Sequence, residues 1–339
     1  MHQRKTYGHL SLLHADPVIL YAIDWELFDP TAGLWTILEE LPVRRSHLVL
    51  AMSSTLEDWQ FVLRVGAEMQ RFTNRFKHVV VTIKANNAAE LANVKTRGLR
   101  ALLCSQNALV KEDLFYPIPD SSKFFDAIYD AKWADFKRHQ LAANIQNLAL
   151  LAFPLEQACS QNYSQDVRPM LEHATWLTSP WMDNPPYLSC AQVNEAYNKS
   201  RVGLCLSRVE GAMFSSVQYL LAGLPVVTTR NTGGRDEFFD QETVRWVDDD
   251  PCAVSQAVAE LASLSLPPSS IRQKALEKIA VHRQRMLEFM QKTISDEDGQ
   301  IGRWHSWPQD LPNKLMEPVA EIRDVLRAIK EHSQGKSLR

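Results

Sequence analysis

Serine hydroxyls and backbone N–H groups come together at the start of one predicted helix. Val202–Leu206 is a short apolar run that predicts a buried parallel strand, and apolar residues at helical spacing follow over Met213–Ala222. Ser215 and Ser216 lie in the first turn of that helix. The start of a helix offers unpaired N–H donors and a partial positive charge, which suit a phosphate group. The stretch therefore predicts a site for a phosphorylated ligand.

The elements around these serines are typical of a parallel α/β sheet. Val209-Glu210-Gly211 turns the chain between strand and helix, Gly223 ends the helix, and Pro225 opens a second strand, Val226–Thr229. This order places the turn and the helix start at the carboxyl edge of the sheet, where open α/β sheets bind their ligands.

The same stretch resembles the signature of the retaining glycosyltransferases of family 4, also called group 1. In that family a glutamate opens the turn, a second glutamate follows eight positions later, and a Gly-x-Pro and a Gly-Gly loop lie beyond. Here Glu210 holds the first position, Gly223-Leu224-Pro225 forms the Gly-x-Pro, and Gly233-Gly234 forms the loop. Gln218 stands at the position of the second glutamate and departs from the family pattern.

A second motif of this family lies upstream. Family members place a basic residue after the first strand of the second domain and a lysine five positions later, and both contact the donor diphosphate. Lys132 and Lys137 match in type and spacing after a strand predicted at Asp126–Tyr129. Fixed cations in a closed site stabilise the charge of a leaving diphosphate without a metal. Two lysines on a solvated helix start are the alternative, and the register with Glu210 favours the functional interpretation.

The resemblance implies a role for each matched residue. Glu210 reaches hydroxyls of the donor sugar, and Glu210, Lys132 and Lys137 are the candidate catalytic residues. Gln218 keeps an acceptor oxygen for the ribose hydroxyls but no charge, so bonds of about 1.5–3 kcal/mol become neutral ones of about 0.5–1.5 kcal/mol. The implied donor contacts are Lys132, Lys137, Glu210, Gly211, Ser215, Ser216, Val217, Gln218, Gly233 and Gly234.

Strands alternate with helices through both halves of the chain, which predicts two parallel sheets covered by helices. The resemblance implies the α/β GT-B architecture, with two Rossmann-like domains facing a cleft. We expect an acceptor domain at residues 1–122 and a nucleotide-sugar donor domain at residues 123–312, with a helix near 313–333 packing back on the first. The first strand, Pro17–Asp24, lacks GxGxxG, which disfavours a dehydrogenase.

Other elements are expected from the same patterns. In the first half we expect helices at Thr31–Leu41, Thr55–Phe76 and Ala88–Gly98 and strands at His47–Met52, His78–Lys84 and Ala101–Cys104. In the second half we expect helices at Lys137–Leu148, Ala191–Lys199, Asp250–Ala262 (capped by Asp250) and Ser269–Lys292.

Acceptor-side residues are expected at the edge of the first sheet. Asp24 ends the first strand and Glu26 follows it, so either carboxylate could serve as a general base if the reaction inverts. A capping or solvated carboxylate is the alternative for each. Gln106 and Asn107 are expected to face the cleft from the linker side.

Composition narrows the class of protein. A net charge of −3 over 339 residues gives no reason to expect nucleic acid as a partner. No apolar run is long enough to span a bilayer, and the first residues lack a signal-like core, which predicts a cytoplasmic protein. The five cysteines show no CxxC pair, which favours reduced thiols. The basic helix over 272–292 could dock on anionic lipid as a peripheral membrane contact, although we favour a solvated face.

No metal and no cofactor are expected, and the oligomeric state stays open. The ten histidines show no spacing typical of metal ligands. Asp248-Asp249-Asp250 resembles a metal-binding DxD motif, but its place directly before Pro251 favours a helix cap. The sequence thus predicts a glycosyltransferase of the kind used in polysaccharide biosynthesis. It would move a sugar from a nucleotide-sugar donor to a glycan, lipid-linked or small polyol acceptor, and the resemblance implies metal independence and retention of configuration.

Two other functions stay open. One is a non-catalytic GT-B-like protein that binds sugar nucleotides, which Gln218 and the lack of a phosphate-binding glycine near Phe153-Pro154 support. The other is a sugar-nucleotide epimerase, which shares the fold.

Overall fold

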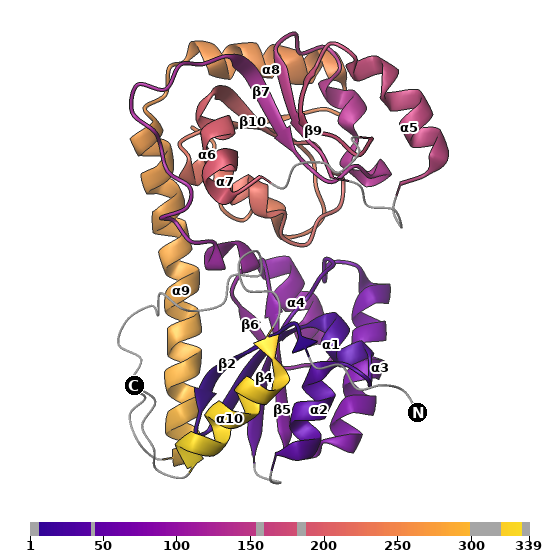
Figure 1. Cartoon of the computed structure of the whole chain (residues 1–339), viewed down its shortest axis with the longest axis vertical. Helices are drawn as coiled ribbons and strands as arrows, with labels where there is room; N and C mark the ends of the chain where they lie inside the picture. Colours follow the sequence, from indigo (N-terminus) through magenta and orange to yellow (C-terminus); the bar gives the residue numbers. More distant parts are fainter. Residues whose placement is uncertain (1–6, 42–44, 154–158, 182–187, 299–319, 334–339) are drawn as a thin grey trace. The chain divides into compact units, whose positions relative to one another are not determined.

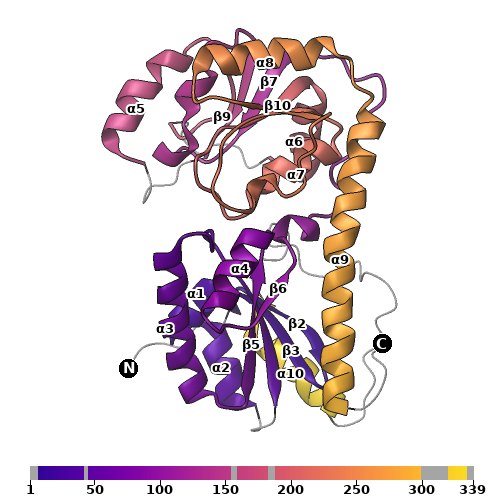
Figure 2. The same cartoon turned by 180° about the vertical axis from the view of Figure 1, so that it is seen from behind.

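The computed structural model divides the chain into two compact units (Figures 1 and 2). One unit comprises Met1–Val110 and Ala280–Arg339, and the other comprises Lys111–Ile279. The structure describes residues 7–41, 45–153, 159–181, 188–298 and 320–333. The first part of the helix expected near 313–333 lies outside these ranges.

The first boundary falls before residue 122, the end expected from the sequence. The reason is that the segment after Val110 binds the second unit. The N–H groups of Tyr116 and Ile118 donate to the side chains of Asn194 and Asn198, at 3.1 and 2.7 Å. The polar, proline-containing segment at residues 111–122 therefore belongs to the second unit.

A five-stranded sheet forms the centre of the first unit, in the order β2-β3-β4-β5-β6. All neighbours are parallel except β2, which pairs antiparallel with β3. The sequence predicts the parallel strands, whereas no pattern in it indicates β2. The strands are β2 Leu10–Ala15, β3 Val18–Ile23, β4 Ser46–Ala51, β5 Val79–Ala85 and β6 Ala101–Leu103.

Two apolar layers cover this sheet. One layer joins alternate strand residues such as Leu20 and Leu48 to the first four helices and to α10, and the other joins Ile19 and Val49 to Met286 and Met290 of α9. A further two-stranded pair joins β1 (Tyr7–Gly8) to β13 (Ala320–Glu321). The helices are α1 Asp24–Phe28, α2 Gly33–Glu40, α3 Trp59–Arg75, α4 Ala88–Thr96, α9 Pro268–Asp298 and α10 Ile322–Ser333.

The division between the units falls inside α9, which is one continuous helix of 31 residues (Figure 1). This helix begins at Pro268, the second residue of a Pro-Pro pair and one position before the expected start at Ser269. Helix α10 packs against α2 and β2 of the first unit.

The second unit contains a six-stranded, fully parallel sheet in the order β12-β11-β10-β7-β8-β9. Helices α6 and α7 lie on one side of this sheet and α8 on the other (Figures 1 and 2). The strands are β7 Phe125–Asp130, β8 Leu148–Leu151, β9 Thr175–Thr178, β10 Ser200–Cys205, β11 Val226–Thr229 and β12 Val244–Val247. The helices are α5 Gln161–Val167, α6 Cys190–Asn198, α7 Phe214–Leu221 and α8 Pro251–Ser263.

Two local predictions in this unit have different outcomes. The cap of α8 is confirmed, because the Asp250 side chain accepts from the N–H of Ala253. The helix expected at Lys137–Leu148 is wrong: two 3-10 turns, η2 (Asp135–Lys137) and η3 (His139–Ala142), replace it. Arg138 between them has a φ of 55°, a left-handed conformation that a continuous helix does not allow.

Long-range contacts hold Arg138 in this conformation. Its guanidinium donates to the Leu206 carbonyl at 2.7 Å, to the Thr229 hydroxyl at 2.6 Å and to the Asp249 carboxylate at 2.5 Å.

All five cysteines are free thiols, as expected. None of the described helices combines the length and the apolar character that a membrane-spanning helix needs.

Candidate functional site

The predicted donor residues gather at the switch point of the second sheet. Strand β7 comes first in the chain and has β8 on one side and β10 on the other, so the direction of strand order reverses between β7 and β10. Ligands of open α/β sheets bind outside the carboxyl ends of the strands at this point. The segments with Lys132 and Lys137 follow β7, and those with Glu210 and the glycines follow β10 and β11.

An ion pair joins two of the predicted residues across 73 positions of sequence. The Lys137 ammonium donates to the Glu210 carboxylate, and the two side chains are only 8% and 11% exposed. The Tyr129 hydroxyl fixes the Lys137 backbone by donating to its carbonyl at 2.6 Å. Because the pair is buried, it places a cation and a carboxylate side by side in a site of low dielectric.

Lys132 lies on the same loop as Lys137 but differs from it in exposure. Its side chain is exposed and makes no hydrogen bond or ion pair with the described part of the chain. The structure thus brings Lys137 and Glu210 into contact and leaves Lys132 as an exposed cation just after β7.

The Glu210 turn and the Gly-Gly loop are joined through their backbones. The Glu210 N–H donates to the Thr232 carbonyl at 3.0 Å, and the Gly234 N–H donates to the Gly211 carbonyl at 2.9 Å. Gly233 has a φ of 115°, which residues other than glycine rarely adopt. The two loops that the resemblance assigns to the donor therefore form one continuous wall, and Gly233 is required by its conformation.

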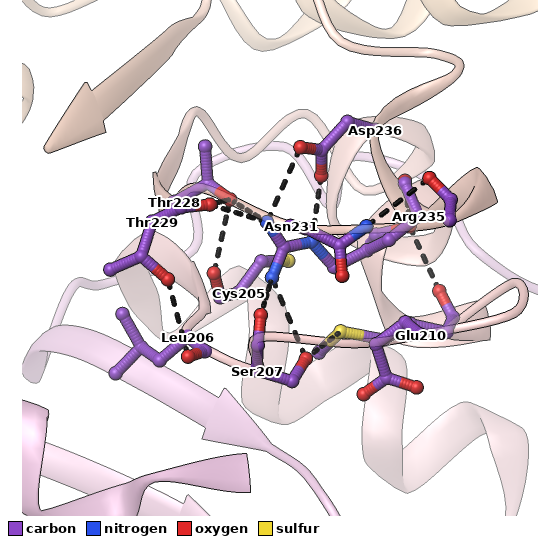
Figure 3. A network of polar contacts seen from close by, with 12 residues as sticks. Cys205, Leu206, Ser207, Glu210, Thr228, Thr229, Asn231, Arg235 and Asp236 are labelled. Atoms are coloured by element: carbon purple, nitrogen blue, oxygen red, sulfur yellow. Dashed lines mark hydrogen bonds and ion pairs between the residues drawn. The ribbon is translucent and has the colours of Figure 1, made fainter. Parts of the chain in front are cut away.

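Arg235, which sequence reasoning treats only as a neighbour of the glycines, anchors this wall (Figure 3). Its side chain is 0% exposed and donates to the carbonyls of Ser207 (2.5 Å) and Thr229 (2.6 Å), to the Thr228 hydroxyl (2.7 Å) and to the Asp236 carboxylate (2.7 Å). Burial alone lowers the pKa of this guanidinium, but the adjacent Asp236 raises it overall, so Arg235 stays charged.

The serines at the start of α7 have protein partners. The Ser215 hydroxyl donates to the Asp130 carbonyl at 2.9 Å, and the Ser216 hydroxyl lies 2.8 and 3.1 Å from the carbonyls of Met213 and Arg235. Since each hydroxyl has one proton, neither can donate to a phosphate while it keeps these bonds. Val217 is 0% exposed and belongs to the core. Contact of these three residues with a donor stays a prediction.

Gln218 is nearly buried, with 5% exposure, and its side-chain oxygen lies 3.0 Å from the Tyr197 hydroxyl. That hydroxyl also lies 2.5 Å from the carboxylate of Asp130, the last residue of β7. Sequence reasoning does not single out Asp130. The signal that could have revealed it is a carboxylate at the end of an apolar strand, two positions before Lys132.

Comparison with solved structures identifies the architecture. HepE from Anabaena, in a structure described as a complex with UDP and glucose, matches 80% of this chain and 77% of its own at 12% identity and a TM-score of 0.59. Sucrose-phosphate synthase from Thermosynechococcus elongatus matches 83% and 72% at 13% identity and a TM-score of 0.53. A trehalose-phosphate synthase from Burkholderia xenovorans, described as a complex with glucose-6-phosphate, matches 82% and 74% at 12% identity and a TM-score of 0.52.

The chain has the GT-B fold. The expected fold class is therefore confirmed. No family model and no curated protein sequence matches the chain. Membership of glycosyltransferase family 4 stays a resemblance carried by the motifs around Lys137 and Glu210.

The predicted acceptor-side carboxylates of this GT-B chain hold the backbone of the first unit. Asp24 is 1% exposed and accepts from the N–H of Trp25 and from the N–H and hydroxyl of Ser53, at 2.7–3.0 Å. Glu26 is 4% exposed and accepts from the N–H groups of His9 and Leu34, at 2.7 and 3.1 Å. Both carboxylates thus bind groups within the first unit and are not solvated, and a general-base role stays a prediction.

Gln106 and Asn107 lie in a 3-10 turn, η1 (Gln106–Leu109), after β6. Both are buried, and the Gln106 amide donates to the Met52 carbonyl at 2.5 Å. Their contact with an acceptor stays a prediction.

Within the described ranges, no group of three or more His, Cys, Asp and Glu side chains could hold a metal ion. Asp249 instead pairs with Arg138 and Arg208.

A buried histidine beside the Lys137 turn leads to a pH-dependent prediction. His139 is 0% exposed, its N–H and its ring Nδ1 lie 2.8 and 2.9 Å from the Tyr163 hydroxyl, and burial lowers its pKa to about 3. An unfolded histidine binds a proton near pH 6.5. Between about pH 3 and pH 6.5, His139 is protonated in the unfolded state and neutral in the folded state. His139 should therefore lower the free energy of unfolding by about 1.4 kcal/mol for each pH unit from 6.5 down toward 3.

Urea unfolding of the wild type and of His139→Gln between pH 7 and 4 measures this term. Other groups titrate equally in both proteins, so the difference between the two slopes isolates His139. Equal slopes would show that the folded histidine accepts a proton as readily as the unfolded one.

Proposed function

We propose that this protein is a glycosyltransferase that moves a sugar from a nucleotide-sugar donor to a hydroxyl group of an acceptor. The observation that carries the proposal is the buried pair of Lys137 and Glu210 at the switch point between β7 and β10. A donor bound there would set its diphosphate against Lys137 and its sugar against Glu210. The GT-B fold, and the UDP and glucose named for the HepE structure, support the choice of donor.

In the proposed reaction the bond between the anomeric carbon and the diphosphate oxygen breaks, and an acceptor hydroxyl oxygen forms the new bond to that carbon. The acceptor hydroxyl loses its proton, which the leaving diphosphate can take up. The leaving nucleoside diphosphate gains negative charge. Lys132 and Lys137 would stabilise it as fixed cations, so the proposal includes no metal ion. Retention of configuration and a glycan, lipid-linked or small polyol acceptor rest on the family resemblance.

Thermal unfolding with a panel of nucleotide sugars tests donor binding. A ligand at 100 times its dissociation constant stabilises the folded state by about 2.7 kcal/mol. For a domain of roughly 150–250 residues this raises the unfolding midpoint by about 5–10 °C. UDP-glucose, GDP-mannose and ADP-glucose are suitable first ligands. A panel that leaves the midpoint unchanged at millimolar concentrations would overturn the proposal.

Product analysis then separates the proposed enzyme from the two alternatives. A transferase releases nucleoside diphosphate faster when an acceptor is added, and the sugar appears on the acceptor. A binding protein shows the thermal shift without release. An epimerase changes the sugar of the nucleotide in the absence of any acceptor.

A further inference from the structure

Asp130, at the carboxyl end of β7, is held by hydrogen bonds at its carboxylate Oδ2, its backbone N–H and its backbone carbonyl. Its carboxylate Oδ2 accepts from the Tyr197 hydroxyl at 2.5 Å. Its backbone N–H donates to the Tyr219 hydroxyl at 2.7 Å, and its carbonyl accepts from Ser215 at 2.9 Å. Gly203 makes room for Tyr219, because a Cβ atom at that position would lie 2.5 Å from the Tyr219 ring. Two helices and a neighbouring strand thus set the direction of this one carboxylate.

Only one oxygen of this carboxylate is used by the protein. Asp130 is half-buried, and its Oδ1 has no hydrogen-bond partner within the described ranges of the chain. Burial raises the pKa of Asp130, while the bond from Tyr197 and the charge of Lys137 act in the opposite direction. A rigid carboxylate with one open oxygen stands at the switch point, two positions before Lys132.

Gln218 is chemically matched to this carboxylate. Tyr197 has a single hydroxyl proton, and the charged Asp130 oxygen at 2.5 Å is its stronger acceptor. The Gln218 Oε1 lies 3.0 Å from the same hydroxyl, and turning the amide by 180° would present its NH₂ group to Tyr197 as a donor. A glutamate at 218 has no proton to give and would place a second negative charge across one phenol from Asp130. An uncharged glutamine therefore fits beside a carboxylate at 130 better than a glutamate does.

We propose that Asp130, through Oδ1, binds the ribose hydroxyls of the donor nucleotide, the task that the family resemblance gives to position 218. This inference rests on the proposed function. A carboxylate accepts from hydroxyl groups more strongly than an amide does. Its place beside Lys132 would set the ribose next to the diphosphate. In this assignment the carboxylate that binds the ribose lies at the end of β7, and not on α7, where the family signature has it.

Calorimetric titration with UDP, 2′-deoxy-UDP and inorganic pyrophosphate tests the assignment, with GDP and ADP and their deoxy forms run alongside. Asp130→Asn should weaken UDP binding about tenfold, the difference between a charge-assisted and a neutral hydrogen bond. It should remove most of the preference of the wild type for UDP over 2′-deoxy-UDP and should not weaken pyrophosphate binding. Asp126→Asn, at the opposite end of β7, is the matched control and should leave all three affinities unchanged.

Thermal unfolding distinguishes a ligand contact from a purely structural residue. An asparagine still accepts from Tyr197 and no longer buries a charge, so Asp130→Asn should not lower the unfolding midpoint. A lower midpoint with an unchanged preference for UDP over 2′-deoxy-UDP would assign Asp130 a structural role only and overturn the inference.

Gln218→Glu gives a result of opposite sign for the two assignments. If Asp130 binds the ribose, the new charge repels Asp130 and UDP binding weakens or stays the same. Tighter UDP binding would return the ribose to position 218 and overturn the inference. A wild-type protein that binds neither nucleotide nor pyrophosphate would overturn the proposed function itself. Wild-type UDP binding that Asp130→Asn leaves unchanged would overturn only the Asp130 assignment.

Discussion

Replacing Lys137 with alanine is expected to lower the kcat of sugar transfer by about 10²–10³-fold. The ammonium is a fixed charge on a side chain that is 8% exposed, so solvent screens its interaction with a developing negative charge only weakly. The same change should lower the free energy of unfolding by about 3–5 kcal/mol, because Glu210 is left charged and buried without its partner. Initial rates with saturating donor and acceptor, and urea unfolding, measure the two effects.

A second substitution separates the chemistry from the stability. Lys137→Ala combined with Glu210→Gln removes both charges, so the unfolding free energy should recover most of the loss while the rate stays low. Lys123→Ala is the matched lysine control. Lys123 donates to the carbonyls of Asn198 and Ser200 at the amino edge of the same sheet, and its loss should leave kcat unchanged. A folded Lys137→Ala variant with kcat within threefold of the wild type would contradict the proposed role.

The parts of the fold that follow local rules could be predicted from the sequence. Apolar periodicity together with glycine and proline places α7 within one residue of its observed ends and β11 at its observed bounds, Val226–Thr229. The cap at Asp250 follows from the proline after it, which suits the first turn of a helix. These features depend on residues only a few positions apart.

Features that depend on distant residues could not be predicted in this way. The left-handed Arg138, which ends the expected helix at Lys137–Leu148, is held by Leu206, Thr229 and Asp249. Strand β2 is visible only through its pairing with β3. Local pattern carries no information about such partners.

The candidate site shows the same division. The motifs assign Lys132, Lys137 and Glu210 to one donor site, and the structure places Lys137 and Glu210 in contact. The motifs alone leave Gln218 as a departure from the family. Asp130 and Tyr197 account for it, and their hydrogen bond joins residues 67 positions apart. Under the proposed Asp130 assignment, the departure follows from packing between α6, α7 and β7 and not from the signature that revealed it.

Arg235→Met is expected to lower the free energy of unfolding of the second unit by about 3–5 kcal/mol. Methionine fills much of the volume but donates no hydrogen bond. The carbonyls of Ser207 and Thr229 and the Thr228 hydroxyl then lose the guanidinium as a donor, in a site that is 0% exposed. Each buried acceptor left without a donor costs about 1–3 kcal/mol. Urea unfolding followed by tryptophan fluorescence measures the loss.

Arg245→Met is the matched control, because Arg245 forms an ion pair of the same kind at the surface. Arg245 and its partner Glu260 are 30% and 55% exposed, so this change should cost less than about 1 kcal/mol. Asp236→Asn should also cost less than Arg235→Met, since Asp236 is 25% exposed and Arg235 keeps its other acceptors. The loss of unfolding free energy should therefore be larger for Arg235→Met than for Asp236→Asn or Arg245→Met, because Arg235 is the most deeply buried of the three side chains.

Because Arg235 also ties Gly233 and Gly234 to the ends of β10 and β11, nucleotide affinity should fall with its loss and stay unchanged in Arg245→Met. Equal stabilities of the Arg235→Met and Arg245→Met variants would mean that the buried guanidinium does not hold this wall of the site.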